Sequence, residues 1–329
     1  MKRGYLTIGE QLTVALARLM HGMTQSAPYR WLHRMGFRGR GLVIAAPSVW
    51  LLLFFAIPFV IVLKIAFSTT VLGIPPYAPL IEWTGDQALA IRLNLANFAF
   101  LLSDALYVNA YLYSVKVAGI STLLCLLLGY PMAYGIARAS PAWRNVLLMM
   151  VILPFWTSFL LRVYAWIGIL RTDGLLNDLL LMLRIIDEPL VMLQTDFAVY
   201  IGIVYSYLPF MVMPLYANLE KMDLTLLEAA ADLGCRPWKA FLRITLPLSV
   251  AGIVAGSMLV FIPAVGEFVI PELLGGPDQL MIGRVLWNEF FNNRDWPVAS
   301  AVAVAMLVLL VLPIMIFQYI QGRQMTAHR

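Results

Sequence analysis

Residues 227–248 read LEAAADLGCRPWKAFLRITLPL, a charged stretch between two strongly apolar segments. Glu228 begins a run of strong helix formers, and Gly234 is placed to end that helix in a left-handed cap. Pro237 suits the first turn of a second helix, and Leu246–Pro247 interrupts the run before the next apolar segment. The stretch therefore predicts two short helices that meet at a glycine and lie across a membrane surface.

The composition of the whole chain is that of a membrane protein. Of its 329 residues, 61% are hydrophobic and 12% are charged, whereas a soluble domain carries about 25% charged residues. The two cysteines do not predict a disulfide scaffold, and the three scattered histidines form no metal-binding pair. We therefore expect an all-α membrane protein that binds no cofactor or metal itself and has no nucleic-acid partner.

Six windows are long and apolar enough to cross the hydrocarbon core, which takes about 20 residues. They are 42–67, 112–137, 145–170, 197–219, 249–271 and 297–321. With the amino terminus inside, most of the 23 basic residues fall on one side and most acidic residues on the other. The positive-inside rule then predicts a multi-pass protein with six transmembrane helices and both termini in the cytoplasm.

The spacing within the quoted stretch is specific. Its pattern is Glu-Ala-Ala, three residues, Gly, nine residues, Ile, one residue and Leu-Pro. The defined positions are Glu228, Ala229, Ala230, Gly234, Ile244, Leu246 and Pro247. This pattern resembles the EAA loop of ABC-importer permeases, which forms coupling helices that dock on a cytoplasmic ATPase. Physics alone leaves another interpretation open, an amphipathic loop on anionic headgroups.

The resemblance implies that a separate ATPase dimer binds ATP and magnesium. None of the lysines follows a glycine, so this chain carries no Gly-Lys-Ser/Thr step to cradle phosphates. We accordingly expect a membrane subunit that is not itself an enzyme.

Longer stretches resemble the membrane subunits of spermidine/putrescine ABC importers, over about residues 45–313, and the putrescine permeases above all. They are GIPPY (73–77), LPFWTSFLLRVYAWIGIL (153–170) and FIPAVGEFVIPELLGGPDQLMIGRVLWNEFFNNRDWPVASAVA (261–303). The resemblance implies a MetI-like type I importer fold in the bacterial inner membrane. It also implies a second, unlike permease, a periplasmic polyamine-binding protein, and the import of a polyamine, with putrescine expected.

On this basis the chain divides into four parts. They are a basic cytoplasmic arm, 1–41; the first membrane helix and an outer loop, 42–111; a permease core, 112–321, with coupling loop 220–247; and a cytoplasmic tail, 322–329. Within the arm, Tyr5–Met23 predicts either an interfacial amphipathic helix or a flexible tail. The outer loop opens with turn residues and ends in an amphipathic pattern around Asn97–Tyr107.

Glu267 is the one acid inside a predicted span, where an ion costs ~3 kcal/mol on insertion scales. Pro263 and Gly266 precede it and are expected to break the fifth helix. A cationic amine needs carboxylates and aromatic faces, so we expect a substrate path with several candidate residues. They are Glu267, Trp156, Tyr164, Trp166, Phe268 and Asp196.

Each candidate has a structural alternative. Glu267 is equally suited to pair with a base near the outer ends of the spans, and these bases are Lys64, Lys116 and Arg162. The aromatic residues suit an interfacial belt or helix packing. Two other functions stay open: an ion- or proton-coupled secondary transporter of a cationic solute, with Glu267 as the proton site, and a membrane scaffold without transport.

Overall fold

The structure is a computed structural model of the chain, and it describes residues 39–84, 88–91 and 93–327. The chain divides into two compact units, Met1–Val62 and Leu63–Arg329, which are described separately. The predicted helix Tyr5–Met23 and nearly all of the basic arm lie outside the described residues.

The first unit holds α3 (Gly39–Leu51), a π-helical turn (Leu52–Ala56) and most of α4 (Ile57–Ala66). These elements join into one apolar helix, Val43–Ala66, of membrane-spanning length. Its bounds agree with the first predicted window, because an uninterrupted apolar run favours a helix in which every backbone group is satisfied internally.

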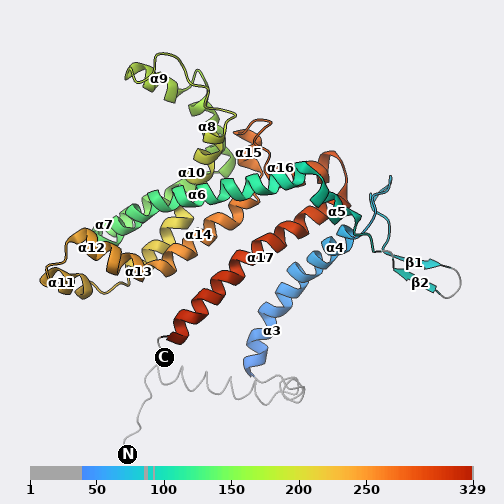
Figure 1. Cartoon of the computed structure of the whole chain (residues 1–329), viewed down its shortest axis with the longest axis horizontal. Helices are drawn as coiled ribbons and strands as arrows, with labels where there is room; N and C mark the ends of the chain where they lie inside the picture. Colours follow the sequence, from blue (N-terminus) through green and yellow to red (C-terminus); the bar gives the residue numbers. More distant parts are fainter. Residues whose placement is uncertain (1–38, 85–87, 92, 328–329) are drawn as a thin grey trace, which may run out of the picture. The chain divides into compact units, whose positions relative to one another are not determined.

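Three helices form the centre of the second unit: α6 (Ala105–Arg138), α10 (Asp196–Leu219) and α14 (Val250–Val265) (Figure 1). Small residues allow their backbones to approach closely. A Cβ atom on Gly256 would lie 2.8 Å from the sulfur of Met211, and one on Gly129 would lie 3.0 Å from its Cγ. Met211 is itself fully buried, so the three helices meet around this side chain.

The third predicted span is sharply bent. It begins with α7 (Pro141–Ile152) and a 3₁₀ turn (Leu153–Trp156), and it continues with α8 (Phe159–Leu170) and α9 (Leu175–Met182). The two halves are bent by 90° at the break after Trp156. Pro154 lacks an amide N–H, and the hydroxyl of Thr157 donates to its carbonyl at 2.7 Å, which closes the first half. We expected a straight span over 145–170, so this bend is a correction.

The fifth predicted span, 249–271, overlaps a pair of helices, Pro237–Leu248 and Val250–Val265, bent by 64° where α14 begins. The expected break beside Gly266 is present. α14 stops at Val265, Gly266 follows, and the chain resumes as α15 (Val269–Leu273). The last part of the unit comprises α16 (Ile282–Trp287), a π-helical turn (Asn288–Asn292) and α17 (Trp296–Ala327), whose apolar part is Trp296–Val311. Within the described ranges, three helices are long and apolar enough to cross a membrane, or five if each bent pair counts as one span, and they overlap the first five predicted windows. The sixth window, 297–321, lies on α17, whose apolar part is shorter.

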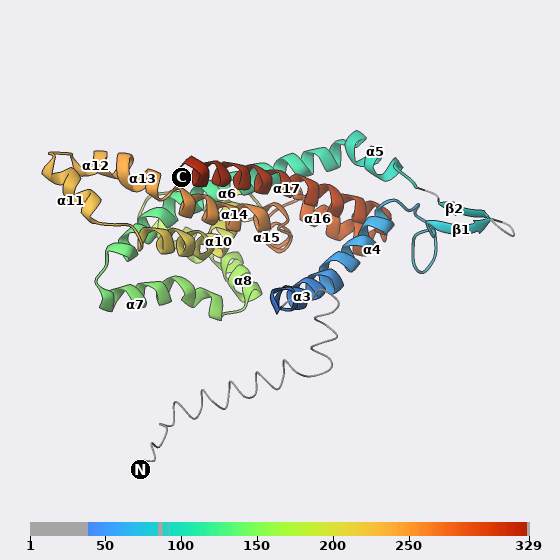
Figure 2. The same cartoon turned by 90° about the horizontal axis from the view of Figure 1, so that it is seen from below.

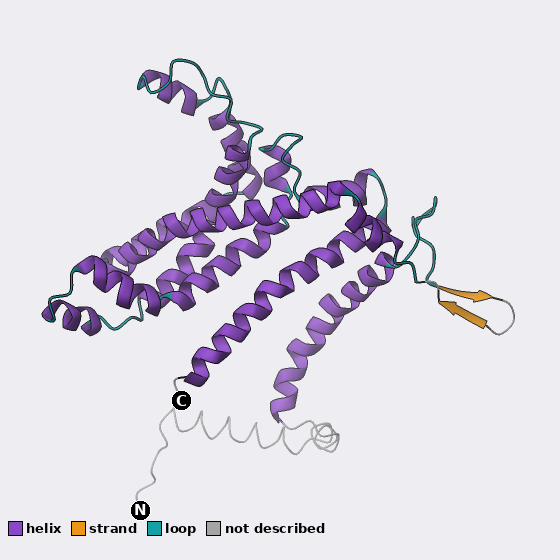
Figure 3. Cartoon of the chain, in the orientation of Figure 1, coloured by secondary structure: helices purple, strands orange, loops and turns teal. Residues whose placement is uncertain are grey.

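The first outer loop holds a hairpin that the sequence did not predict. β1 (Ile81–Thr84) pairs antiparallel with β2 (Ala88–Ile91), and these are the strands of the described part of the chain (Figure 3). Strands of four residues are too short for an alternating pattern to stand out. The expected amphipathic segment is α5 (Ala96–Ser103), which ends before Asp104, whose carboxylate caps α6 by accepting from the amide of Leu106 at 2.8 Å.

Candidate coupling loop and membrane-embedded site

The first half of loop 220–247 is α11 (Thr225–Asp232), which ends at Gly234 as predicted. Gly234 has φ 73°, the left-handed conformation that glycine adopts without a steric cost. Its amide donates to the carbonyl of Ala231 at 2.8 Å, and the amide of Cys235 donates to that of Ala230 at 2.9 Å. These two bonds make a Schellman cap, so the glycine position in the sequence pattern has a defined backbone role.

The second half begins with α12 (Pro237–Ala240), with Pro237 in the first turn as predicted. The helix continues through a π-helical turn, Phe241–Thr245, into α13 (Leu246–Leu248). We expected Leu246–Pro247 to end the run, but the bend comes later, at Ser249. Pro247 has no amide N–H to donate a helical hydrogen bond. The helix continues through it because the wider π turn before it already replaces the regular hydrogen-bond pattern.

Phe241 ties this second half to the end of α6. Its ring packs edge-on against Tyr130 and Tyr134, with ring centroids 5.5 and 6.1 Å apart. The hydroxyl of Tyr130 lies 2.8 Å from that of Ser249, where α14 begins. The loop is therefore joined by aromatic and polar contacts to two of the three central helices.

An ion pair anchors the start of the loop. A guanidinium nitrogen of Arg144 on α7 lies 2.8 Å from the carboxylate of Glu220, which follows α10. The other terminal nitrogen of Arg144 donates to the carbonyl of Ala137 at 3.3 Å. Three helices thus meet at the point where the loop leaves the bundle.

The opposite side of the loop is open. Leu233 is 88% exposed and Trp238 is 57% exposed, and the ammonium group of Lys239 lies 5.5 Å from the Trp238 ring. In Figures 1 and 2 the loop projects from the end of the bundle opposite α5 and α16. Of the motif residues, the exposed ones are Glu228, Ala229, Gly234 and Pro247, and the covered or partly covered ones are Ala230, Ile244 and Leu246.

Glu267 lies in the break between α14 and α15 and is 7% exposed. One carboxylate oxygen accepts from the backbone amides of Phe268, Val269 and Ile270 at 3.0–3.3 Å. The other accepts from the hydroxyl of Tyr207 on α10. The side chain thus caps α15 and fastens the break to α10, which sequence reasoning missed because it depends on local backbone geometry.

The predicted ion pairs of Glu267 are not formed. Among the residues that the structure describes, no lysine or arginine nitrogen lies within 4 Å of its carboxylate, including those of Lys64, Lys116 and Arg162. The alternative in which one of these bases neutralises Glu267 is therefore not supported, because backbone amides and a tyrosine hydroxyl already serve both oxygens.

Phe268 begins an aromatic stack next to the break. Its ring lies parallel to Trp287 of α16 with centroids 4.3 Å apart, and Trp287 packs on Phe291 at 4.1 Å. Gly283 lets α16 approach the break closely, since a Cβ on this residue would lie 2.5 Å from the carbonyl oxygen of Gly266. Trp287 and Phe291 were not among the predicted residues, although their four-residue spacing on a helix could have indicated them.

The other candidates occupy separate places. Trp156 and Tyr164 are 72% and 55% exposed. Asp196 accepts hydrogen bonds from the hydroxyl of Tyr113 at 2.9 Å and the amide of Gln279 at 3.0 Å. Asp196 also precedes Tyr207 by about 16 Å along α10, so the structure does not bring it to the Glu267 site.

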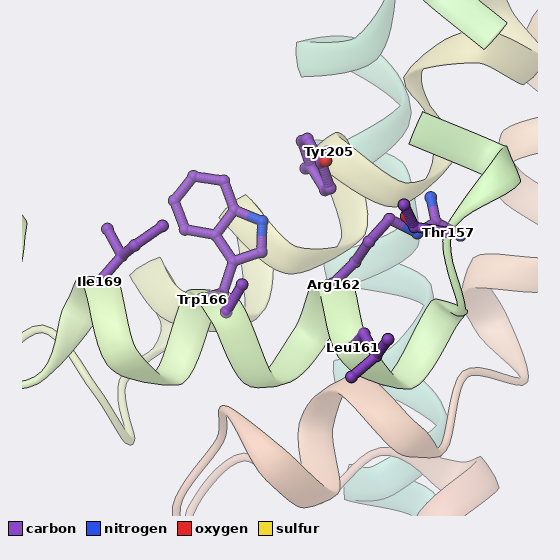
Figure 4. A pocket seen from close by; sticks show the side chains of 7 residues that line it. Thr157, Leu161, Arg162, Trp166, Ile169 and Tyr205 are labelled. Carbon is purple, nitrogen blue, oxygen red and sulfur yellow. The ribbon is translucent and has the colours of Figure 1, made fainter. Parts of the chain in front are cut away.

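Trp166 packs edge-on against Tyr205 of α10, at 5.5 Å, and lines a cavity of about 370 Å³. Figure 4 shows Arg162 and Trp166 on the side of α8 that faces Tyr205. Arg162 thus places a positive charge beside one of the predicted path residues. From the sequence, Arg162 was named only as a possible partner of Glu267.

Comparison with known proteins supports the assignment of the fold. Residues 125–327 match the family described as binding-protein-dependent transport system inner membrane component. The fold resembles a bacterial ABC transporter involved in the import of the acidic polysaccharide alginate, with a TM-score of 0.65, 16% identity, and 91% of this chain and 99% of that chain covered. It also resembles the MetNI methionine ABC transporter, with a TM-score of 0.51, 15% identity, and 68% and 95% covered.

Curated relatives include two spermidine/putrescine transport system permease proteins named PotB. The one from Haemophilus influenzae is 39% identical over 84% of this chain, and the one from Escherichia coli K12 is 40% identical over 82%; each match covers 92% of the relative. These relatives are not the putrescine permeases that we expected. The shared regions are those of membrane subunits rather than enzymes. The chain therefore belongs to the binding-protein-dependent transport system inner membrane components and has their MetI-like type I importer permease fold.

Proposed function

We propose that the chain is one of two membrane subunits of an ATP-driven importer that brings polyamines of the spermidine and putrescine class into the cytoplasm. The observation that carries this proposal is the identity of 39–41% to spermidine/putrescine permeases over more than four fifths of the chain. The narrower proposal, a preference for putrescine, rests on the resemblance of residues 153–170 and 261–303 to the putrescine permeases.

The proposed ATPase contact is the open side of loop 220–247. Leu233 and Trp238 expose apolar surface there, which a soluble cleft would cover with a gain of about 25 cal/mol per Å² of apolar area. A pair of ATPase subunits, with ATP and magnesium bound in them, would close on these loops. We place this face in the cytoplasm, as the positive-inside rule predicts.

The contacts on the covered side of the loop provide a route by which a movement of the loop would reach the central helices. A push on α12 would reach α6 through Phe241 and its two tyrosine neighbours, and it would reach α14 through Ser249. The pair Arg144–Glu220 would hold the loop's other end to α7 and α10. Packed elements with such contacts move together rather than deform, so the loop can turn the central helices toward a new arrangement.

At the opposite end of the bundle, a cavity of about 290 Å³ has a lining suited to an ammonium group. Its polar members are Asn288, Glu289, Asn292 and Asn293. The carboxylate of Glu289 accepts from the hydroxyl of Tyr107 at 2.8 Å and from the amide of Asn293 at 3.0 Å. We propose that a polyamine released by the periplasmic binding protein first meets this end.

Glu267 and Phe268 remain our proposed residues of the membrane path. Since Glu267 is enclosed, a passing ammonium would have to replace the hydroxyl of Tyr207 as its partner. An ammonium brings a positive charge to the carboxylate, whereas the tyrosine hydroxyl brings a neutral donor, so the exchange is favourable once the break opens. The cavity beside Trp166 is less suited, because the positive charge of Arg162 repels a cation there.

The test is uptake of labelled spermidine and labelled putrescine by the complete transporter in proteoliposomes. We expect saturable uptake of both in the presence of the binding protein, with putrescine preferred at equal concentration. Preference for spermidine would remove only the narrower proposal. Transport of neither amine by an active, fully assembled complex would remove the polyamine assignment.

A further inference from the structure

Arg162 is a base in a predicted membrane span, and the described residues form no ion pair with it. It lies in the predicted span 145–170, one turn after the break at which this span bends by 90°. In the part of the chain that the structure describes, no Asp or Glu oxygen comes within 4 Å of its guanidinium. Two of its nitrogens, Nε and Nη1, are buried without a hydrogen-bond partner.

Aromatic rings supply part of what the guanidinium lacks. Its central carbon lies 4.9 Å from the centroid of Phe155 and 5.7 Å from that of Phe159. These residues stand on either side of the break, so the cation–π contacts join its two halves. A ring face offers no oxygen, however, and the N–H groups still lack an acceptor.

Among the described residues, none accepts a hydrogen bond from Nε or Nη1. Arg162 lines the cavity of about 370 Å³ with mostly apolar neighbours, which include Leu161, Ala165, Trp166 and Ile169. The polar side chains of the remaining lining are the neutral hydroxyls of Thr157 and Tyr205, and the carboxylate of Glu267 has four partners elsewhere. Arginine in a membrane faces a protein interior or water and pairs with an acid, since leaving it in lipid is costly.

We infer that this cavity receives a carboxylate from the second permease subunit. The inference rests on the proposed function only in assuming a second permease. The planar guanidinium can take a carboxylate through two parallel hydrogen bonds, and the cavity is large enough for an acidic side chain. On the same helix, Leu160, Leu161 and Tyr164 are 48–67% exposed and provide an apolar rim for a packed helix.

The test uses the complete transporter, extracted through a tag on this chain. Arg162→Met keeps an unbranched apolar stem and removes the charge, and Arg162→Lys keeps the charge but loses the fork. We expect Arg162→Met to recover at least tenfold less second permease and Arg162→Lys an intermediate amount. Lys116→Met, which also removes an exposed base from a predicted span, should recover the wild-type amount.

A purely structural role of Arg162 predicts a different pattern: a lower melting temperature of this chain with full recovery of the second permease. That pattern would overturn the inference. A short photo-crosslinker on Ala165→Cys, in a background with Cys235→Ser, supplies a second measurement. A crosslink to the second permease is expected, and crosslinks to lipid alone would also overturn the inference. Neither measurement uses a substrate, so a transporter that fails to carry polyamines leaves both of them interpretable.

Discussion

Loop 220–247 and the break at Gly266–Phe268 both interrupt apolar helices, yet their side chains find partners in different places. At the break, Glu267 is 7% exposed, and both of its oxygens accept hydrogen bonds from this chain. In the loop, Leu233 and Trp238 project away from the bundle with more than half of their surface free. A polar group whose hydrogen-bond partners lie in its own chain stabilises the conformation of that chain. An exposed apolar group on a helix turn can instead be covered by another protein.

Arg162 is a third case for this comparison, and it also lies in a predicted membrane span. It sits at a break, like Glu267, but its guanidinium has no acceptor among the described residues. Glu267 and Arg162 therefore need experiments that test different kinds of contact. Changes at Glu267 test a contact within the chain, and changes at Arg162 test a contact between chains.

The largest effect is expected for Leu233→Asp. The side chain is 88% exposed, so the fold tolerates the change, but a charge in the proposed docking surface opposes ATPase binding. We expect at least tenfold less ATPase to co-purify and uptake to be lost. The matched control is Ile185→Asp, an aliphatic residue that is 64% exposed on the predicted outer side, and it should retain the ATPase. Equal ATPase recovery from both variants would remove the distinction between the loop and other exposed surfaces.

A smaller, several-fold fall in uptake is expected for Glu267→Gln. The amide oxygen can still accept from the backbone amides of α15, and its nitrogen can donate to Tyr207, so the melting temperature should hold. Tyr207→Phe is the matched control, because it keeps the charge and removes one hydrogen bond to a carboxylate, worth about 1.5–3 kcal/mol. Uptake per assembled complex and melting temperature are measured for both. Normal uptake with a lowered melting point in Glu267→Gln would leave Glu267 with the structural role alone.

Gly283→Ala should act on stability. The added Cβ would lie 2.5 Å from the carbonyl oxygen of Gly266 and 2.7 Å from that of Glu267, so the backbone must shift. Such overpacking costs about 1–3 kcal/mol, and we expect a lower melting temperature. Gly119→Ala, where no atom lies within 4 Å of the new Cβ, is the control and should leave the melting temperature unchanged or raised. Equal melting temperatures for both variants would show that the break is loosely packed.

The smallest effect on function is expected for single cysteines that report topology. The background carries Cys235→Ser, because Cys235 is partly exposed, while Cys125 is buried. In intact cells, Asp278→Cys should react with an impermeant thiol reagent, and Lys239→Cys should not. Both variants should retain uptake. The reverse labelling would place the loop outside and separate it from any cytoplasmic ATPase.

Much of the fold could be predicted from the sequence, because membrane spans depend on length and hydropathy alone. The end of α14 before Gly266 was also predictable. The 90° bend after Trp156 was not, since a proline such as Pro154 is tolerated in many membrane helices and does not by itself specify an angle. The short strands of the outer loop lacked a pattern long enough to recognise.

The features of the candidate site also divide into those that the sequence could predict and those that it could not. Gly234 was predictable, because a left-handed residue after a helix favours glycine whatever surrounds it. The partners of Glu267 and Arg162 were not, because they depend on which helices lie side by side. One alternative from the sequence offered Arg162 among three possible partners of Glu267, whereas Glu267 contacts backbone amides and Arg162 contacts aromatic rings.

The central claim, that loop 220–247 couples an ATPase to transport, is tested most directly by ATP-driven uptake in the complete transporter with Gly234→Ala and Gly234→Asp. A Cβ at this position meets no atom within 4 Å, so Ala costs only the left-handed strain, on the order of 1 kcal/mol. We predict that Ala keeps the ATPase and most of the uptake, whereas Asp loses both while the six membrane helices stay folded. Wild-type ATPase recovery together with normal uptake in Gly234→Asp would contradict the claim.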